Sequence, residues 1–554
     1  MKKVFAKKSS TFRMHSVLEK SLKTALFSLL SLSIQAASAA PISEIASNKT
    51  SLLAFQKVVK GKVVDEKGTP IPGVNVVIKG SKTGVQTDMD GSFAIEVPSS
   101  STILVFSFLG MQEQETAAGN SSLKIIMKEL GQQMDEVVVV GYSKVKKESL
   151  TGSLQTLDNK KIVDITTPAV ENMLAGKATG VFVNTGGGQP GSVGKIIIRG
   201  RTTVNGSTDP LWVIDGVIVG NSSGNMNPAD IETLTVLKDA ASTAVYGSQG
   251  ANGVIVVTTK SGKKGKPTIS FSARTALTTI NNGNFDIMNG AELYDLYDSF
   301  ANKEDFENVW WWTPELRNKN YNWWNNGTQT GIANDYNLSI SGGGDNFKSY
   351  VSLGYYDETG AVKGYEYKKY NGLMKFEYKP NTWFTLRPQI NLTKETTFDQ
   401  QHSVGALYGN MPWDSPYSED GTLVGNAPNP TWVNTTGSNY LYDLQWNYGE
   451  SESYTVRGNT DFDIKFTNWL TFASVNNYIF GNYNSTYYSD PRSSSGEAVK
   501  GRIEDYFSTY NRVYTNQLLR FNTTIDKHSI NAVAGYEWNE YNSKYSNGIA
   551  TGIP

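Results

Sequence analysis

The stretch NPADIETLTVLKDAASTAVYGSQGANGVIVVTTKSG, residues Asn227–Gly262, decides the fold of the central part of the chain. It opens on Asn227-Pro228, which predicts a capped turn, because an Asn side chain accepts hydrogen bonds from the amides that follow and Pro suits the first helical position. The elements expected next are a strand, a short helix that ends at Gly247, and a second strand, at Glu232–Leu237, Ala240–Tyr246 and Val254–Thr259. This order predicts a compact α/β unit.

The same kind of pattern extends upstream, so that the α/β unit covers residues 148–264. A short helix is expected to begin at Thr167-Pro168, with Thr as its cap and Pro at the first helical position, and to end at Gly176. Three apolar runs predict further strands, at Gly180–Val183, Lys195–Arg199 and Leu211–Val219.

The loop Gly186–Gly191 matches the G-x-G-x-x-G pattern of dinucleotide-binding sites. In those sites the loop opens a helix whose N-terminus faces the pyrophosphate. Here Pro190 and Gly191 lead into the strand Lys195–Ile198 instead. We therefore interpret the pattern as a flexible glycine-rich loop and expect no nucleotide cofactor.

The first 39 residues have the pattern of a secretory signal peptide. Seven basic residues and one acidic residue precede the apolar run Ala25–Ile34, and Ala37-Ser38-Ala39 is a small-residue cleavage site. This apolar run is too short to span a bilayer, which takes about 20 residues. Removing residues 1–39 changes the formal net charge from −1 to −7, and an acidic chain argues against a nucleic-acid partner.

The 554 residues include no Cys and three His. This composition excludes thiol nucleophiles, disulfides, and zinc or iron–sulfur sites built from Cys. His15 leaves with the signal peptide, and neither His402 nor His528 has a nucleophile-elbow sequence nearby. We expect no catalytic residue, no metal, no cofactor and no enzyme activity.

Residues 58–128 alternate short apolar runs with turns that contain Gly and Asp, which predicts a small β-sandwich. The turn Asp88-Met89-Asp90-Gly91 contains part of a calcium-loop pattern but lacks its third ligand and its closing Glu, so we interpret it as a hairpin turn. The run Gly61–Ile95 closely resembles carboxypeptidase-regulatory-like domains. The resemblance implies a binding or spacer module without catalysis.

A short acidic and then apolar segment, residues 134–147, follows the sandwich. Its four consecutive Val residues, Val137–Val140, favour an extended conformation and are unsuited to exposure on their own. One interpretation is a strand that adds to the sheet edge of a partner protein. The other is a last strand of the sandwich, and the pattern alone does not choose between them.

Residues 265–554 contain stretches that alternate apolar and polar residues, with aromatic residues at their ends. Nine of these stretches are expected to be strands: Thr268–Thr279, Tyr336–Ser341, Lys348–Tyr356, Glu366–Tyr378, Trp383–Lys394, Tyr454–Phe466, Trp469–Tyr478, Arg512–Thr524 and His528–Trp538. Most are about ten residues long or slightly longer, which fits a tilted bilayer span, and short turns alternate with long loops as in membrane β-barrels. The alternative is a soluble β-sandwich with a carbohydrate-binding face.

Long polar loops are expected at residues 280–335 and 397–451, and the first is rich in Trp. Exposed aromatic residues on loops often bind a ligand or a partner, because their flat faces stack on sugars and other rings. The candidate substrate-contact residues are Trp310, Trp311, Trp312, Trp323 and Trp324. Packing within a core or an interface is the alternative role.

Three runs in the α/β unit resemble the plug of SusC/RagA-type TonB-dependent outer-membrane transporters: IIIRG (Ile196–Gly200), WVIDGV (Trp212–Val217) and the stretch Asn227–Gly262. The plug-motif residues that this resemblance implies are Arg199, Gly200, Asp215, Gly216, Lys238, Asp239, Tyr246, Gly247, Gly250 and Gly253. For Arg199 it suggests an ion pair between the plug and the barrel wall. The alternative is a solvent-exposed Arg at the end of a strand.

The segment DEVVVVGY resembles the TonB box of the same family. The resemblance implies that these residues pair with the periplasmic protein TonB: Asp135, Glu136, Val137, Val138, Val139, Val140, Gly141 and Tyr142. It also implies an outer-membrane location, contact with membrane lipid, a SusD-like surface lipoprotein as partner, and energised import of a glycan or peptide. The rival hypothesis is a surface-exposed β-rich binding or adhesion protein without transport.

The chain is thus predicted to be mainly β, with a β-sandwich, a small α/β plug and part of a transmembrane antiparallel β-barrel. About 290 residues follow residue 264, and we find nine strands in them, whereas the large plugged transporters close with about 22. The residues after Trp538 are expected to form a polar loop. The sequence therefore predicts an incomplete barrel, and so a truncated transporter or gene fragment.

Overall fold

The computed structural model describes most of the chain between residues 57 and 553. The residues outside the description are 1–56, 66–67, 82, 100, 109–110, 120–121, 129–136, 141–142, 147–153, 163–164, 282–283, 285, 301–311, 400–404, 427–430, 435–436, 527 and 554. The predicted signal peptide lies among them, as do Trp310, Trp311 and the four residues that flank Val137–Val140 in the predicted TonB box. The chain forms two compact units, and the boundary between them follows residue 134.

The first unit is a sandwich of two sheets, which confirms the predicted fold. Its described strands are β1 (Lys57–Val64), β2 (Asn75–Ile78), β3 (Gly84–Gln86), β4 (Ser92–Val97), β5 (Ile103–Ser107), β6 (Gln114–Ala117) and β7 (Leu123–Ile126). The strand orders are β4-β1-β7 and β3-β2-β5-β6, and a single apolar core lies between the sheets. The Asp88 carboxylate accepts hydrogen bonds from the amides of Asp90 (3.1 Å) and Ser92 (2.8 Å), so it closes a turn, as expected.

The Val-rich segment belongs to the second unit. Strand β8 (Val137–Val140) pairs antiparallel with β9 (Ser143–Lys146) in a two-stranded sheet of its own. The extended conformation is therefore confirmed, and the alternative that this segment is the last strand of the sandwich is wrong.

The α/β unit, called the plug from here on, contains a five-stranded sheet and a separate two-stranded one. Its strands are β10 (Leu154–Asp158), β11 (Val181–Asn184), β12 (Lys195–Ile198), β13 (Leu211–Ile214), β14 (Val217–Gly220), β15 (Ile231–Leu237) and β16 (Val254–Thr259). Its helical turns are α2 (Asn159–Ile162), α3 (Val170–Met173), η2 (Pro228–Asp230), α4 (Ala240–Thr243) and η3 (Ala244–Gly250). The large sheet has the order β10-β15-β16-β13-β14, while β11 pairs with β12.

The run Leu211–Val219 is a hairpin and not the single strand that the sequence predicts. Asp215 (φ 50°) and Gly216 (φ 88°) both adopt left-handed backbone conformations and form the turn between β13 and β14. Asp-Gly between two apolar runs favours this turn, because its twist matches that of the flanking strands.

Two helix starts in the plug show how far local capping rules hold. Asn227 caps its turn as predicted, because its side chain accepts from the Ala229 amide at 3.0 Å. Helix α3, however, begins only at Val170, so the expected cap at Thr167 is wrong. The predicted helix Ala240–Tyr246 is divided into α4 and η3.

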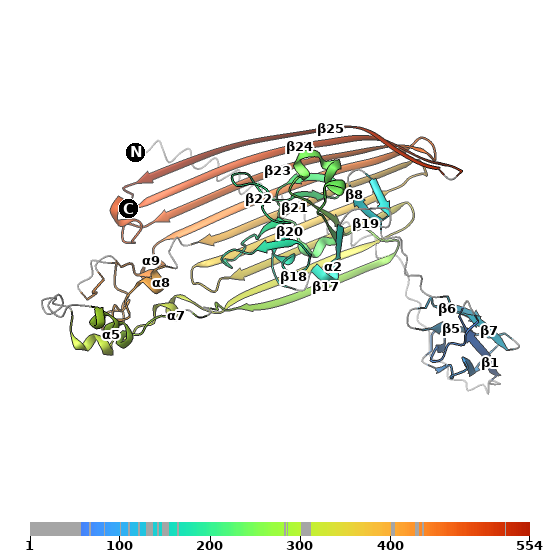
Figure 1. The fold of residues 1–554 in the computed structure, drawn as a ribbon, viewed down its shortest axis with the longest axis horizontal. Coiled ribbons are helices and arrows are strands. Elements are labelled where there is room, and N and C mark those ends of the chain that lie inside the picture. The colour runs from blue at the N-terminus through green and yellow to red at the C-terminus, as the bar shows by residue number, and fades with distance from the viewer. Residues whose placement is uncertain are drawn as a thin grey trace, which may run out of the picture. The chain divides into compact units, whose positions relative to one another are not determined.

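The rest of the second unit is a nine-stranded antiparallel sheet, called the wall. Its strands are β17 (Gly265–Thr278), β18 (Gly331–Gly343), β19 (Phe347–Thr359), β20 (Tyr365–Tyr378), β21 (Phe384–Asp399), β22 (Tyr448–Lys465), β23 (Leu470–Ser489), β24 (Arg502–Ile525) and β25 (His528–Thr551). They pair in sequence order, and the plug lies over one face of the sheet (Figure 1).

The nine predicted wall strands are confirmed, but they are longer than expected, at 13 to 24 residues. Strand β25 continues to Thr551, so the polar loop expected after Trp538 is wrong. The alternating pattern of that segment is concealed by the many Asn, Ser and Tyr residues in it.

Alternation gives the wall one apolar and one polar face. In β18 the side chains of Tyr336, Leu338 and Ile340 are exposed, whereas Asp335 and Asn337, which have the opposite parity, line a pocket against the plug. This arrangement is expected of a strand with lipid on one side and a polar lumen on the other.

The connections differ between the two ends of the wall. At one end, short turns join β18 to β19, β20 to β21, β22 to β23 and β24 to β25. At the other end only the connection from β19 to β20 is as short among the described strands. The longer connections carry α5 (Gly290–Phe300), η4 (Pro314–Asn318), α7 (Trp323–Gly327), α8 (Ala406–Gly409), α9 (Tyr440–Asp443) and η5 (Glu497–Val499). Figure 1 shows α5, α7, α8 and α9 gathered at one end of the sheet.

Among the described residues, no helix is long and apolar enough to cross a membrane.

Candidate functional site

Wall side chains hold the plug by donating hydrogen bonds to its main-chain carbonyls. Lys369 of β20 is 3% exposed, and its Nζ donates to the carbonyl oxygens of Pro168 (3.0 Å) and Met226 (3.4 Å). Two residues further along the same strand, the Asn371 amide donates to the carbonyl of Asn225 at 3.4 Å. A buried ammonium group and an irregular loop of the plug thus satisfy each other.

Two arginines of the wall continue this pattern, one at the same loop and one at strand β14. Arg457 of β22 donates to the carbonyl of Gly224, and Arg512 of β24 to that of Ile218, each at 3.4 Å. Gly224 has a φ of 65°, a left-handed conformation that favours glycine, and a Cβ atom there would displace the Arg457 guanidinium. The wall therefore holds residues 218–226 through several of their backbone carbonyls.

Glu395 of β21 connects the buried lysine to the plug. Its Oε1 lies 3.7 Å from Lys369 Nζ and accepts from the Tyr367 hydroxyl at 2.6 Å. Its Oε2 accepts from the side-chain amide of Asn225, also at 2.6 Å. Asn225 has a φ of 59°, a left-handed conformation that Asn tolerates better than most residues.

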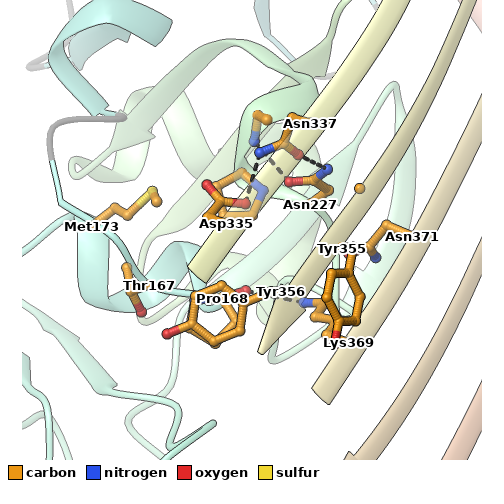
Figure 2. Close-up of a pocket in the computed structure, with 13 residues that line it drawn as sticks. Thr167, Pro168, Met173, Asn227, Asp335, Asn337, Tyr355, Tyr356, Lys369 and Asn371 are labelled. Carbon is orange, nitrogen blue, oxygen red and sulfur yellow. Dashed lines mark hydrogen bonds between the residues drawn. The ribbon is translucent and has the colours of Figure 1, made fainter. Parts of the chain in front are cut away.

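Figure 2 shows the small pocket beside these contacts. The Asn227 side chain donates to Asn337 of β18 at 2.8 Å, and Asn337 donates to Asp335 at 2.7 Å. The pocket encloses about 10 Å³, which is at the lower limit for one water molecule. This part of the interface is therefore packed too closely to admit a solute.

Asp215, in the turn between β13 and β14, forms an ion pair with the wall. Its carboxylate accepts from the Thr259 amide (2.9 Å) and hydroxyl (2.6 Å), and Lys375 Nζ of β20 donates to it at 3.1 Å. Burial by itself raises the pKa of Asp215, but the Lys375 charge and the hydrogen bonds from Thr259 outweigh it, so the pKa lies below its ordinary value. Asp215 is therefore ionised at neutral pH.

Asp230 is a second carboxyl group buried between plug and wall, and it is 2% exposed. Its Oδ1 accepts from the Tyr350 hydroxyl of β19 at 2.9 Å, while its Oδ2 has no hydrogen-bond partner in the described structure. Burial raises the pKa of Asp230 above its ordinary value, against the smaller lowering effects of Ser352, Tyr350 and Lys260. The shift of the Asp230 pKa is therefore opposite in direction to that of Asp215.

Comparison with known families and proteins identifies both parts of the chain. The CarboxypepD_reg-like domain family matches residues 59–139, and the TonB-dependent Receptor Plug Domain family matches residues 146–254. TonB-dependent receptor SusC of Bacteroides thetaiotaomicron is 34% identical over 441 residues, which are 74% of this chain and 43% of the relative. TonB-dependent receptor P3 of Formosa agariphila is 30% identical over 497 residues, 88% of this chain and 48% of the relative.

Solved structures show the same fold. The RagAB peptide importer in its 'open-open' state has a TM-score of 0.66 at 22% identity, over 75% of this chain and 50% of that chain. The chain belongs to the SusC/RagA-type TonB-dependent receptors. It spans about half the length of the curated relatives it matches. Membership confirms the expected outer-membrane location, and the wall corresponds to part of the receptor barrel.

Several residues of the predicted plug motif have local roles inside the receptor plug. Lys238 Nζ donates to Gln155 Oε1 (3.2 Å) and to the Thr179 carbonyl (2.6 Å), so it fastens β10 to the rest of the plug. Asp239 caps α4 by accepting from the Ser242 amide at 2.8 Å. The predicted glycines with left-handed backbone are Gly200, Gly216, Gly247 and Gly253, and Gly250 packs against the buried Tyr246.

Arg199 is exposed in the described structure, as in the alternative role considered for it. Its charge lies close enough to Lys238 to lower that residue's pKa, although burial of Lys238 has the larger effect. The ion pair found between plug and wall joins Asp215 to Lys375. An ion pair of Arg199 with the barrel stays a prediction.

Sequence reasoning missed the wall partners of the plug. Lys369, Asn371 and Lys375 share one parity in the strand Glu366–Tyr378, and residues of one parity point to one face. Charged side chains at that parity of a membrane strand indicate the lumen, so the lysines could have been identified as plug contacts. Their partners, by contrast, lie about 140 to 200 positions away in the sequence.

The described tryptophans of the predicted substrate loop differ in exposure. Trp323 is 3% exposed, and its indole N–H donates to the carbonyls of Met411 (3.2 Å) and Asp414 (3.0 Å), so it has the packing role. Trp312 stacks on Tyr294 at 4.3 Å, and both Trp312 and Trp324 are half-buried. Contact with substrate stays a prediction for these two.

We expect Asp215→Asn to loosen the β13–β14 hairpin from the wall. The two side chains are 11% and 17% exposed, and removing one partner of a buried ion pair costs about 3 kcal/mol or more because the other charge stays buried. Hydrogen exchange of the Thr259 amide, which donates to Asp215, should rise about 100-fold in the purified receptor.

Asp209→Asn is the matched control, since the Lys195–Asp209 pair is 4.0 Å long and its side chains are 55% and 33% exposed. Its effect should stay below about 1 kcal/mol. Equal exchange at Thr259 in the two variants would contradict the assignment.

Asp230→Asn should keep or raise the stability of the plug at neutral pH. A carboxyl whose pKa is raised on folding stabilises the native state at low pH, and this contribution is lost as the pH rises above 3.8, its ordinary value, through the raised pKa. The variant removes this dependence while its Oδ1 still accepts from Tyr350.

The measurement is the thermal unfolding midpoint at about pH 4 and about pH 7. Asp230→Ala serves as the comparison, because it also loses the hydrogen bond from Tyr350 and should be less stable by about 1 kcal/mol at both pH values. A pH dependence that is unchanged in Asp230→Asn would refute the role of this carboxyl.

Proposed function

We propose that the receptor containing this chain imports a nutrient across the outer membrane, with energy supplied through TonB. The observation that carries this proposal is the polar contact between plug and wall. Hydrogen bonds from charged donors of this kind contribute about 1.5–3 kcal/mol each, because water replaces them when they break. Such contacts hold the part of the plug that faces the wall, so a pull acts first on the part that they do not hold.

Strand β8 is the proposed site of TonB binding, together with the flanking Asp135, Glu136, Gly141 and Tyr142. One edge of β8 pairs with β9, and among the described strands its other edge is unpaired. A free edge can accept a partner's strand through main-chain hydrogen bonds. TonB could therefore bind without opening the hairpin.

A pull on β8 would reach the plug first at β10. This strand lies at the edge of the five-stranded sheet and pairs over five residues with β15. Residues 218–226 and Asp215, by contrast, are held by the wall. We propose that the pull detaches β10 and leaves the wall-held part of the plug in place.

The proposed substrate is a glycan or a peptide, and the proposed outer partner is a SusD-like surface lipoprotein. Support comes from two similarities: the curated relative is named SusC, and the structural neighbour is described as a peptide importer. The curated relatives are named as receptors, and we propose no enzyme activity for this chain.

Val139→Pro should abolish uptake while substrate binding at the cell surface is retained. Proline lacks the N–H that strand pairing requires. The readout is uptake of a labelled nutrient that supports growth only when the receptor is present.

Val139→Thr is the matched control, because Thr keeps the N–H and favours strands. Uptake that is equal in the Pro and Thr variants would remove β8 from the mechanism. Surface binding without uptake in the unsubstituted receptor would favour the adhesion alternative.

A disulfide between β10 and β15 should block uptake until it is reduced. Thr156 and Thr235 pair directly, with hydroxyl oxygens 3.1 Å apart, and antiparallel partners have the Cα separation that a disulfide needs. The chain has no Cys, so the double variant Thr156→Cys/Thr235→Cys can form one bridge within it.

The matched pair is Thr233→Cys/Thr258→Cys, which joins β15 to β16 inside the part that is proposed to stay in place. This bridge should leave uptake unchanged. Equal inhibition by both bridges would mean that the plug moves as one body, and no inhibition by either would exclude detachment of β10.

A further inference from the structure

A cavity of about 540 Å³ lies between the plug and the wall, next to the Asp215–Lys375 ion pair. Its plug side consists of the Asp215-Gly216 turn, the end of β16 and Ser261-Gly262, and its wall side consists of residues from β19 to β24. The volume falls within the range of about 300–1,000 Å³ that is usual for small-molecule sites. Unlike the pocket of Figure 2, this cavity has room for a solute.

Charged side chains line the cavity, four of each sign. Six of them already form three ion pairs: Lys348 with Glu377 (2.9 Å), Lys375 with Asp215 (3.1 Å), and Arg387 with Asp463 (2.6 Å). The two that remain are Asp461 of β22 and Arg520 of β24. A lining with no net charge therefore presents one acid and one base that lack an ion-pair partner among the described residues.

The same two residues carry buried polar atoms without a hydrogen-bond partner in the described structure, namely Asp461 Oδ1 and Arg520 Nε. Asn516 of β24 adds a third such atom. It is 2% exposed, its amide nitrogen donates to the Tyr514 hydroxyl at 3.2 Å, and its Oδ1 has no partner. Asn516 and Arg520 have the same parity in β24 and so lie on one face.

These groups are complementary to one kind of ligand. Asp461 Oδ1 and Asn516 Oδ1 require a donor, and a positively charged donor suits the carboxylate best. Arg520 requires an acceptor, and a carboxylate matches a guanidinium. Arg520 lies four residues along β24 from Asn516, a distance of about 13 Å between Cα atoms, so the two ligand groups must lie apart from each other.

We propose that this cavity binds a small zwitterion, with its ammonium group at Asp461 and Asn516 and its carboxylate at Arg520. A simple anion or cation would leave one wall charge without a partner of opposite charge, and a neutral sugar, which offers only hydroxyl groups, would leave both without one. The inference rests on the proposed import function, in which a solute enters the lumen. It adds a binding site between plug and wall, beside the Asp215–Lys375 ion pair.

The test is calorimetric titration of the purified receptor with 6-aminohexanoate, hexanoate and hexylamine, which share one carbon chain and differ in charge. The zwitterion should bind at least about tenfold more tightly than either singly charged probe. Asp461→Asn and Arg520→Gln should each weaken its binding about tenfold, which corresponds to the loss of one charge-assisted hydrogen bond. Arg520→Lys should keep most of the affinity, because the charge remains.

Glu504→Gln is the matched control on the same strand, where Glu504 pairs with Arg502 at 2.6 Å, 16 residues from Arg520. It should leave binding unchanged. Protection of the Thr259 amide in every variant shows that the plug is folded. The site is overturned if the three probes bind equally, if none binds, or if the Asp461 and Arg520 variants bind like Glu504→Gln.

Binding in the purified receptor requires no TonB, so this result is independent of uptake. Zwitterion binding in a receptor that imports nothing would overturn the import function and leave the site standing. Import with no zwitterion binding would overturn the site alone.

Discussion

The structure of the second unit depends on one constraint: each wall strand must be apolar outside and polar inside. The inward row then contains lysines, arginines and amides that need hydrogen-bond partners when they are buried. The plug loop at residues 221–226 has the opposite requirement, because irregular backbone leaves carbonyls without sheet partners. Lys369 and Arg457 satisfy both requirements at once by donating to that loop. Without the loop the buried donors of the wall would lack acceptors, and without the wall the carbonyls of the loop would lack donors.

This arrangement separates what folds the plug from what holds it. The plug has its own apolar core, in which Trp212, Leu234 and Ile255 are buried. Wall residues contribute little to its apolar packing, chiefly Tyr514 and Val475 beside β13 and β14. Losing the wall contacts would therefore leave the plug core intact.

The sequence was informative wherever a local rule determines structure. Alternation located all nine wall strands, and the Asn227 cap was found where the pattern predicted it. Prediction from apolar runs failed at Leu211–Val219. These nine mostly apolar residues were expected to form one strand, but the Asp-Gly pair among them forms a turn. The role of Asp215 could not be predicted from the sequence, since its partner Lys375 is 160 positions away and no local pattern joins them. Burial of Trp323 likewise depends on a second loop, near Met411.

The plug core and the wall contacts together determine which part of the plug can detach. Strand β10 and helix α2 contribute Leu157 and Ile162 to the core, and exposing such side chains costs about 1.5–3 kcal/mol each. Adding the few hydrogen bonds of a five-residue edge pairing and those of Lys238 gives a barrier that a mechanical pull can overcome. Removing β15 or β16 would instead open the centre of the sheet, where every strand has two neighbours. The edge position of β10, and its place directly after the β8–β9 hairpin, therefore make it the element that yields first.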